Sequence, residues 1–306
     1  LGYDKSYALG VIAGSGSLGM LIPPSILLIV WAILTEASVG ALFLGGVVPG
    51  LLLGLVFVLH CAYRAWRNPN LAPTNAPLAT PDSAANQPVS GLVSGLAILL
   101  LVVLVLGGIW LGVFTPTEAA GFGVVGSLLI GWAKGMKRAD FMQAIFESGR
   151  STAPILILLI AGSMYSRMLA VSGGMGLVEE LFTGAGLGAV GTILVMTLVW
   201  LLLGTIIDSI SGILLTVPVF FPIAMAAGIN EVAFAIYGII VIEAGLLTPP
   251  LGLLIFTVKS SVPDSTVTQS EIFKGALPYW ILMLAVASMI FLLPGLASWL
   301  PSRILG

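Results

Sequence analysis

The chain has 306 residues, of which 58% are hydrophobic and 8% are charged, and its formal net charge is −2. Soluble domains carry about 25% charged residues, so a mean hydropathy of +1.15 excludes a water-soluble globule and indicates an integral membrane protein. The few basic residues are scattered, which argues against a nucleic-acid partner. A crossing needs about 20 mostly apolar residues, and such stretches occur near 7–34, 40–63, 90–113, 117–133, 151–171, 188–207, 210–228, 232–258 and 278–300. The tryptophans mostly fall near the ends of these stretches and are expected to anchor them at the membrane interfaces.

The first apolar stretch contains a proline pair that follows a run of small residues. Proline removes a backbone donor and disrupts the helix behind it, so in a membrane the freed carbonyls need partners, which a lined cavity can supply. The glycines of residues 14–25 let the backbone approach a ligand and the serines offer oxygens, although tight packing between membrane helices also selects small residues. The candidate ligand-binding residues here are Gly14, Ser15, Ser17, Gly19, Pro23 and Pro24.

Residues 67–89 are rich in Pro, Asn, Ala and Ser, and no apolar period runs through them. This composition predicts a linker in water. Arg64 and Arg67 precede the linker, and further basic residues follow the next pair of spans, so the positive-inside rule places the linker in the cytoplasm. Residues 90–133 then form one out-and-back helical hairpin.

Two local patterns stand in the middle of the chain. Thr115 can cap a helix that begins at Pro116, and Glu118 completes a capping box, which assigns Glu118 a structural role. Residues 139–150 carry an apolar face and suit a helix that lies at the membrane interface.

Asp208 lies in a polar island of small residues between two apolar runs, which predicts a broken helix. A charge at the centre of a bilayer costs about 2.5–3.5 kcal/mol even on the gentler scale, so an unused carboxylate there is costly. Its oxygen atoms and those of Ser209 and Ser211 suit a sodium ion better than a transition metal. The alternative is that Asp208 caps the following helix at an interface, where the membrane penalty disappears.

A second proline pair interrupts the stretch at 232–258 and follows Glu243 closely. A carboxylate near the C-terminal end of a helix is disfavoured by the helix dipole, so Glu243 needs a partner such as a hydroxyl, an amide or a cation, and we favour a structural brace. The candidate binding residues here are Glu243, Gly245, Thr248, Pro249 and Pro250, and the tentative sodium ligands are Asp208, Ser209 and Thr248.

The two proline pairs are interpreted as equivalent points of two inverted repeats, since paired breaks in two halves of a chain point to a transport site. The predicted organisation is 1–66 as the second half of a first repeat with a hairpin tail, 67–89 as the cytoplasmic linker, 90–138 as a scaffold pair of helices and 139–306 as the second repeat with its broken helix and hairpin. Far less apolar chain precedes Pro23 than Pro249, so the first repeat is expected to be incomplete. The fold class is therefore an all-α polytopic membrane protein with re-entrant hairpins.

Four segments together resemble the large membrane subunit of TRAP transporters, the tripartite ATP-independent periplasmic carriers. They are Gly2-Tyr3-Asp4-Lys5, residues 14–25, Phe114-Thr115-Pro116-Thr117-Glu118-Ala119-Ala120, and residues 243–252. The resemblance covers nearly the whole chain and is weakest in the linker. Members of the family carry about a hundred further residues before this start, so the chain is expected to be N-terminally truncated.

The resemblance implies a sodium-driven importer of small organic anions, usually carboxylates, in the bacterial inner membrane. It also implies a periplasmic substrate-binding protein and a small four-helix membrane subunit as partners, and an elevator movement of a domain with two helical hairpins. By the same resemblance residues 14–25 look like the tail of the first hairpin region and 243–252 like the tip of the second.

Two rival functions stand beside the importer. An intramembrane enzyme is disfavoured, because Asp208 and Glu243 lack a nucleophile–base pair or a dense acidic motif. A transport-inactive scaffold or assembly fragment stays open, because half of the first repeat is missing.

Overall fold

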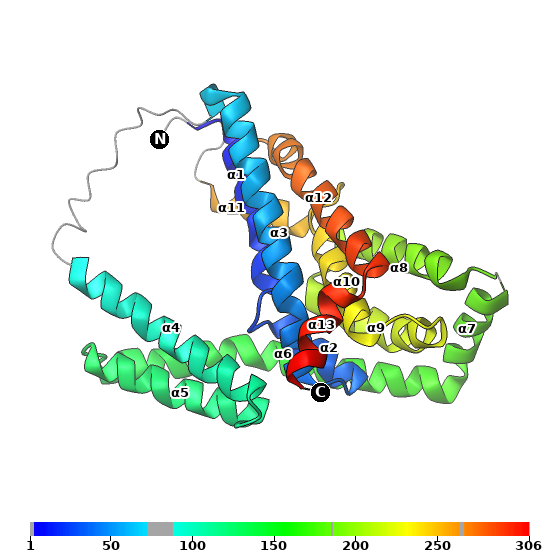
Figure 1. Cartoon of the computed structure of the whole chain (residues 1–306), viewed down its shortest axis with the longest axis horizontal. Helices are drawn as coiled ribbons and strands as arrows, with labels where there is room; N and C mark the ends of the chain where they lie inside the picture. The colour runs from blue at the N-terminus through cyan, green and yellow to red at the C-terminus, as the bar shows by residue number, and fades with distance from the viewer. Residues whose placement is uncertain (1–2, 72–87, 185, 263–265, 306) are drawn as a thin grey trace. The chain divides into compact units, whose positions relative to one another are not determined.

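The computed structural model describes residues 3–71, 88–184, 186–262 and 266–305. Within these ranges it contains thirteen α-helices, two short 3-10 helices and no strand, which confirms the all-α prediction (Figure 1). The described residues fall into two compact units, a smaller one of Asn75–Leu156 and a larger one of Gly2–Thr74 with Ile157–Ile304. Most of the linker predicted at 67–89 lies outside the described residues.

Four of the described helices are long and apolar enough to cross a membrane. They are α3 (Val39–Arg67), α6 (Arg138–Ser172), α9 (Ser209–Ala226) and α12 (Gln269–Leu292). The segments Ile26–Thr35, Ser94–Trp110 and Gly188–Gly204 are also apolar but shorter. These helices agree with an integral membrane protein.

The smaller unit contains α4 (Pro88–Trp110) and α5 (Pro116–Ala133), which pack against each other as the predicted hairpin. Its tip carries the predicted capping box. Thr115 Oγ1 accepts from the Glu118 backbone N–H at 3.3 Å, and Glu118 Oε2 accepts from the Thr115 N–H at 2.8 Å. The structural role assigned to Glu118 is thereby confirmed.

The helix predicted at 139–150 is present as the first part of α6, which runs without interruption from Arg138 to Ser172. No residue with a left-handed backbone divides α6 near residue 150. Pro154 lies inside the helix, where a proline removes one hydrogen bond but does not have to end the helix when neighbouring groups re-satisfy the backbone.

The larger unit begins with α1 (Lys5–Gly16), a 3-10 turn η1 (Ser17–Met20), α2 (Ile26–Thr35) and α3. After α6 it continues with α7 (Gly174–Gly184), α8 (Gly188–Gly204), α9, α10 (Glu231–Gly245), α11 (Leu253–Ser261), α12 and α13 (Gly295–Ile304). The span expected at 278–300 is thus two helices, because the chain leaves α12 after Leu292, before Pro294.

Aromatic rings from three helices, α2, α8 and α10, pack together in the interior of the larger unit. Trp31 and Trp200 lie 6.3 Å apart, centroid to centroid, and Phe234 of α10 lies 5.6 Å from each of them. Both tryptophans are almost completely buried, and the Trp200 indole N–H donates to Thr216 Oγ1 at 2.8 Å. Their predicted role as interfacial anchors is therefore wrong, whereas Trp299 is exposed as an anchor would be.

The two proline pairs occupy the same place in two series of elements. In each series a helix ends before the pair, a short helix follows it, and then comes a long helix with an internal proline, Pro49 in α3 and Pro278 in α12. Each long helix packs against the first helix of the other series: a Cβ on Gly45 of α3 would meet Val232 of α10, and one on Gly275 of α12 would meet Ser6 and Gly10 of α1.

Candidate functional site

Both predicted helix interruptions are present. Between η1 and α2, Pro23 is buried and Pro24 is exposed, and Ser25 caps α2 by accepting from the Leu28 N–H at 3.4 Å. The second interruption, residues 246–252, separates α10 from α11. The Pro23–Pro24 and Pro249–Pro250 peptide bonds are both cis.

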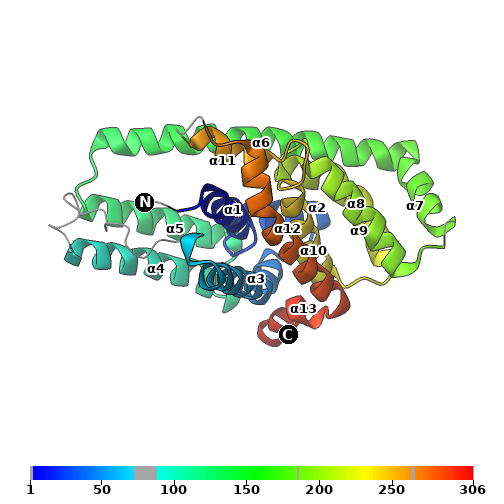
Figure 2. The same ribbon diagram turned by 90° about the horizontal axis from the view of Figure 1, so that it is seen from above.

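The polar island around Asp208 is the tip of a helical hairpin. The helices α8 and α9 pack against each other and lie side by side in both views (Figures 1 and 2), and residues 205–208 join them. The hairpin tip therefore lies at the island, whereas residues 243–252, where the family resemblance placed it, connect the end of α10 to α11. The predicted break in the helix at Asp208 is present.

Asp208 caps the N-terminus of α9. Its Oδ2 accepts from the N–H groups of Ile210 and Ser211 at 3.1 and 3.2 Å, and its Oδ1 accepts from the Ser211 hydroxyl at 2.5 Å. The side chain is exposed. This geometry is the capping alternative, and it does not exclude an ion, because a carboxylate has about four lone-pair sites.

Glu243 is tied to the hairpin tip. It is 3% exposed, and its Oε1 accepts from the Ser209 hydroxyl at 2.5 Å. The hydroxyl partner expected for Glu243 is thus Ser209, the first residue of α9. The hydrogen bond joins the last turn of α10 to the start of α9, which agrees with a brace.

The other helix of the hairpin, α8, touches α10 through the backbone. A Cβ placed on Gly204, the last residue of α8, would lie 2.6 Å from the Cα of Gly245, and one on Gly245 would lie 2.9 Å from the Cα of Gly204. Gly245 was predicted as a ligand-binding residue. The structure shows a different reason for a glycine at this position: α8 and α10 cross so closely there that a side chain would not fit.

Thr248 lies in the second interruption and is held from two sides. Its hydroxyl donates to the Ala244 carbonyl at 3.0 Å and accepts from the Trp280 indole N–H at 2.9 Å. It does not line the pocket that contains Asp208 and Ser209. Of the tentative sodium ligands the structure thus brings Asp208 and Ser209 to one pocket and leaves Thr248 as a support of the loop. Pro249 and Pro250 are exposed.

The small residues of the first interruption have separate environments. A Cβ on Gly14 would lie 2.4 Å from the Tyr279 ring, so Gly14 serves helix packing. The buried Ser17 donates to the Gly14 carbonyl at 2.7 Å, and the exposed Ser15 donates to the Ile12 carbonyl at 3.3 Å. Gly19 is exposed, and a Cβ there would meet nothing within 4 Å.

One pocket of about 310 Å³ brings the hairpin tip and both interruptions together. We call it the break pocket. It is lined by Met20, Ile26, Leu27, Asp208, Ser209, Ile210, Leu246, Leu253, Leu254 and Thr257. All these residues belong to the larger unit. Segments far apart in the sequence thus meet beside the two interruptions. Of the predicted site residues only Asp208 and Ser209 line the pocket, and none of the four prolines does.

The three helices that begin at the break pocket differ in their capping. Ser25 caps α2 and Asp208 caps α9 through their side chains, whereas α11 begins after Gly252, which has a φ of +57° and no capping side chain. A Cβ on Gly252 would also lie 2.9 Å from the Phe273 ring. Of the three helices, only α11 therefore has no side-chain cap at the positive end of its dipole.

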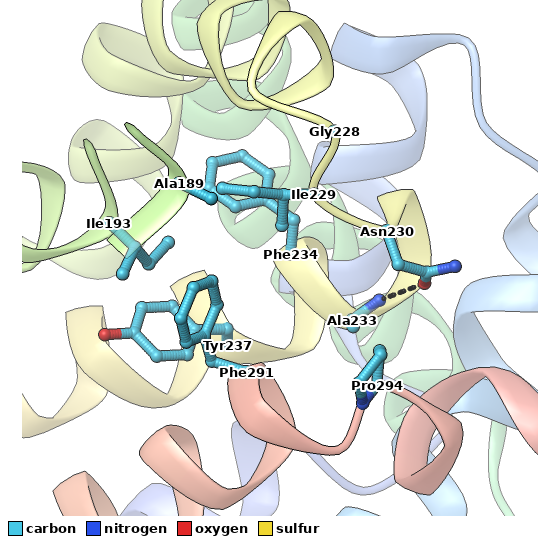
Figure 3. A pocket seen from close by; sticks show the side chains of 10 residues that line it. All are labelled: Ala189, Ile193, Gly228, Ile229, Asn230, Ala233, Phe234, Tyr237, Phe291 and Pro294. Atoms are coloured by element: carbon cyan, nitrogen blue, oxygen red, sulfur yellow. Dashed lines mark hydrogen bonds between the residues drawn. The ribbon is translucent and has the colours of Figure 1, made fainter. Parts of the chain in front are cut away.

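A second pocket, of about 210 Å³, lies at the turn between α9 and α10 (Figure 3). Its walls include Ile193, Ile229, Phe234, Tyr237, Phe291 and Pro294. The amide of Asn230 at its edge caps α10 by accepting from the Ala233 N–H at 3.0 Å. None of its lining residues is charged and none was predicted as a site residue, so the break pocket is the better candidate.

Residues 1–296 match the family model "Tripartite ATP-independent periplasmic transporter, DctM component". The chain is 33% identical over 305 residues to the C4-dicarboxylate TRAP transporter large permease protein of Pseudomonas aeruginosa, covering 98% of this chain and 69% of that protein. It belongs to the DctM family.

Other DctM-family relatives bear the names of different substrates. The sialic acid TRAP transporter large permease protein of Vibrio cholerae is 28% identical over 99% of this chain and 69% of its own length. The ectoine TRAP transporter large permease protein of Halomonas elongata is 28% identical over 98% of this chain and 68% of its own length. The resemblance seen in the sequence is confirmed, and the family consists of transporter components, not enzymes.

Sequence reasoning missed three supporting residues of this DctM-family site. Gly204 could have been noticed, because it opens the small-residue island before Asp208. Trp280 and Tyr279 gave no signal, because a tryptophan or tyrosine in a span is usually assigned to the membrane interface. Only the folded structure shows that Trp280 holds Thr248 and that Tyr279 packs on Gly14.

Proposed function

We propose that this chain is the large permease subunit of a sodium-coupled importer of small organic anions, chiefly carboxylates. The observation that carries the proposal is the break pocket, where a hairpin tip and two helix interruptions converge. Convergent interruptions of this kind are typical of secondary transporters, whose ion and substrate sites lie between broken helices. Relatives named for C4-dicarboxylates, sialic acid and ectoine support an organic solute as cargo.

The pocket offers a negative group for the sodium ion and a positive helix end for the carboxylate. Asp208 would hold sodium with the hydroxyl oxygen of Ser209 and main-chain carbonyls, which are the oxygen ligands that hard cations prefer. The start of α11 would attract the carboxylate, because its dipole end carries no capping side chain. The hydrogen bond from Ser209 to Glu243 would keep the hairpin tip in register with α10.

The two series of elements support inverted repeats, because the long helix of each packs against the first helix of the other. We infer an elevator-type movement in which the elements around the break pocket travel together. The partners would be a small four-helix membrane subunit and a periplasmic substrate-binding protein that delivers the anion, in a bacterial inner membrane. One relative is named the isethionate TRAP transporter permease protein DctMQ, and this chain covers 44% of its length, which supports a further membrane component.

The test is uptake of radiolabelled carboxylates into proteoliposomes that contain the complete transporter with its binding protein, driven by a sodium gradient. Asp208→Asn removes the charge and keeps an N-cap, since Asn caps as well as Asp. We expect uptake by the parent to require sodium and Asp208→Asn to lose that dependence.

The matched control is Asp140→Asn, because the Asp140 carboxylate also accepts from a backbone N–H, that of Lys137, at 2.9 Å, but lies in the smaller unit. Asp140→Asn should keep the sodium dependence. Sodium-dependent uptake that survives Asp208→Asn would remove Asp208 from the ion site, and a parent without sodium-dependent uptake would favour a transport-inactive scaffold.

A further inference from the structure

One side of α3 is apolar and exposed within the described part of the chain. The residues on this side recur at intervals of three and four, so they share one face of the helix. We call them the α3 stripe, which consists of Leu51, Leu55, Val58, Leu59, Tyr63 and Trp66. The stripe is about 22 Å long, which exceeds half of the hydrocarbon core of a bilayer, itself about 30 Å thick. An acyl chain of one leaflet can therefore lie along it.

The α3 stripe ends where three helix ends meet. The Tyr7 hydroxyl at the start of α1 donates to the Cys61 carbonyl of α3 at 3.1 Å. The Ser6 hydroxyl donates to the Glu271 carbonyl of α12 at 2.8 Å. The end of α3 and the starts of α1 and α12 therefore lie side by side (Figure 1). We call this region the basic end, after its basic side chains Lys5, Arg64, Arg67 and Lys274.

The acidic side chains of the basic end are engaged as helix caps. Asp4 caps α1 by accepting from the Tyr7 N–H at 2.8 Å. Glu271 belongs to the capping box of α12, where it accepts from the Thr268 N–H at 2.7 Å. Two acidic side chains thus stand beside four basic ones, and the region carries an excess of positive charge.

The two arginines of the basic end have no acidic partner. The Cζ atom of Arg64 lies 5.8 Å from the centroid of the Tyr7 ring, so a cation–π contact holds its guanidinium beside α1. Arg67 is exposed and follows Tyr63 by four residues, which places it on the same side of α3 as the stripe. Neither arginine forms an ion pair within the residues that the structure describes.

We propose that the α3 stripe and the basic end together bind an anionic phospholipid. The phosphate would lie at Arg67 and Arg64, and one acyl chain would lie along the stripe. Charge complementarity favours this occupant, because anionic headgroups attract basic side chains next to membrane-spanning helices. Exposed tyrosine and tryptophan side chains, such as Tyr63 and Trp66, are typical of the headgroup level. No residue of α3 lines the break pocket, so the lipid site is independent of the proposed transport site.

The experiment measures lipid binding to the purified membrane complex in nonionic detergent by native mass spectrometry. The probes are phosphatidylglycerol and phosphatidylcholine with the same 16-carbon chains (about 16 methylene-type carbons each), phosphatidylglycerol with short chains, and inorganic phosphate. We expect long-chain phosphatidylglycerol to bind at least about tenfold more tightly than phosphatidylcholine, because each basic residue near an anionic headgroup contributes about fivefold. The short-chain lipid should bind at least about tenfold more weakly, since each buried methylene is favourable.

Arg67→Gln tests the basic end without disturbing a packed side chain. It removes the charge from an exposed position, so the preference for phosphatidylglycerol should fall about fivefold. The matched control is Arg303→Gln, which changes an exposed arginine in the last turn of α13. That helix packs at the other end of α3, where a Cβ on Gly45 would lie 3.3 Å from the Ala297 carbonyl oxygen. Arg303→Gln should keep the preference of the parent.

Four results would overturn the inference. They are equal binding of the two long-chain lipids, an unchanged preference in Arg67→Gln, an equal loss in Arg303→Gln, and displacement of the lipid by inorganic phosphate, which would indicate a site for the free ion. If another membrane subunit covers the α3 stripe, the complex shows no preference between the lipids, and the inference fails by the first of these results.

Discussion

At the scale of single residues, Asp208 caps α9 and is also the carboxylate that we propose as a sodium ligand, two roles that the sequence presents as alternatives. Its carboxylate accepts three hydrogen bonds at the start of α9, and because a carboxylate has about four lone-pair sites it retains acceptor capacity. A capping carboxylate is held in one orientation, so it would present a preorganised oxygen to a cation. The capping observed here is thus compatible with the sodium role that we propose.

Glu243→Ala should destabilise the protein more than a surface change of the same kind. It leaves the buried Ser209 hydroxyl without its acceptor, which costs about 1–3 kcal/mol. Thermal unfolding of the purified complex in detergent measures the effect, and Glu243→Gln, which keeps an oxygen acceptor, should lie between Glu243→Ala and the parent.

The control is Glu231→Ala, which removes an exposed carboxylate from the first turn of the same helix and should cost about 0.3–1 kcal/mol. Equal losses for Glu243→Ala and Glu231→Ala would contradict the brace.

Trp280→Phe should loosen the second interruption. The change keeps an aromatic ring and removes the N–H that donates to Thr248, so we expect a loss of about 0.5–1.5 kcal/mol. Faster hydrogen exchange in residues 246–252 would report the same effect locally. Trp299→Phe, at an exposed position of α13, should alter neither reading. The predicted support is absent if Trp280→Phe and Trp299→Phe behave alike.

At the scale of helices, the approach of α8 and α10 determines how the hairpin tip meets the second interruption. Gly204→Ala would place a Cβ 2.6 Å from the Cα of Gly245, and backbone atoms cannot yield as a flexible side chain does. We expect a loss of about 1–3 kcal/mol from the forced displacement and slower uptake, because Ser209 would move with the tip.

Gly54→Ala is the matched control in the helix α3, because a Cβ there would meet nothing within 4 Å. Replacing an unhindered helical glycine by alanine stabilises by up to about 1 kcal/mol. A Gly204→Ala protein as stable and as active as Gly54→Ala would show that the crossing is less tight than the structure has it.

The sequence predicted the elements whose signals are local. Proline pairs mark both interruptions, and Thr115 with Glu118 marks the start of α5. The sequence predicts an interfacial helix at 139–150 and a span at 151–171, because the apolar pattern changes near residue 150. A change of pattern does not by itself end a helix, and the structure has one long helix there, α6. The burial of Trp31 and Trp200 depends on rings from other helices, which no local pattern contains.

The candidate site was predicted in part, for the same reason. Asp208, Ser209 and Glu243 are predicted as site residues because they are polar residues in an apolar part of the chain. In the structure a hydrogen bond joins Ser209 to Glu243, and one pocket contains Asp208 and Ser209. Gly14 and Gly245 were chosen as small residues near the breaks, and the structure uses them for helix packing against Tyr279 and Gly204. A small residue signals close approach without identifying what approaches it.

At the scale of the whole molecule, the proposed transport mechanism requires the break pocket to hold a cation and a carboxylate together. If both occupy neighbouring parts of one pocket, each must raise the affinity of the other by the same factor. A pair of unit charges about 4 Å apart near a protein surface attracts by about 4 kcal/mol before desolvation, so a coupling of tenfold or more is reasonable.

The most direct measurement is the dissociation constant of the transported carboxylate on the purified membrane complex, in sodium and with potassium in its place, together with the sodium dissociation constant with and without the carboxylate. We predict that sodium tightens carboxylate binding at least about tenfold, that the carboxylate tightens sodium binding by the same factor, and that Asp208→Asn abolishes both effects. Carboxylate binding that is equally tight in sodium and potassium would contradict a shared pocket.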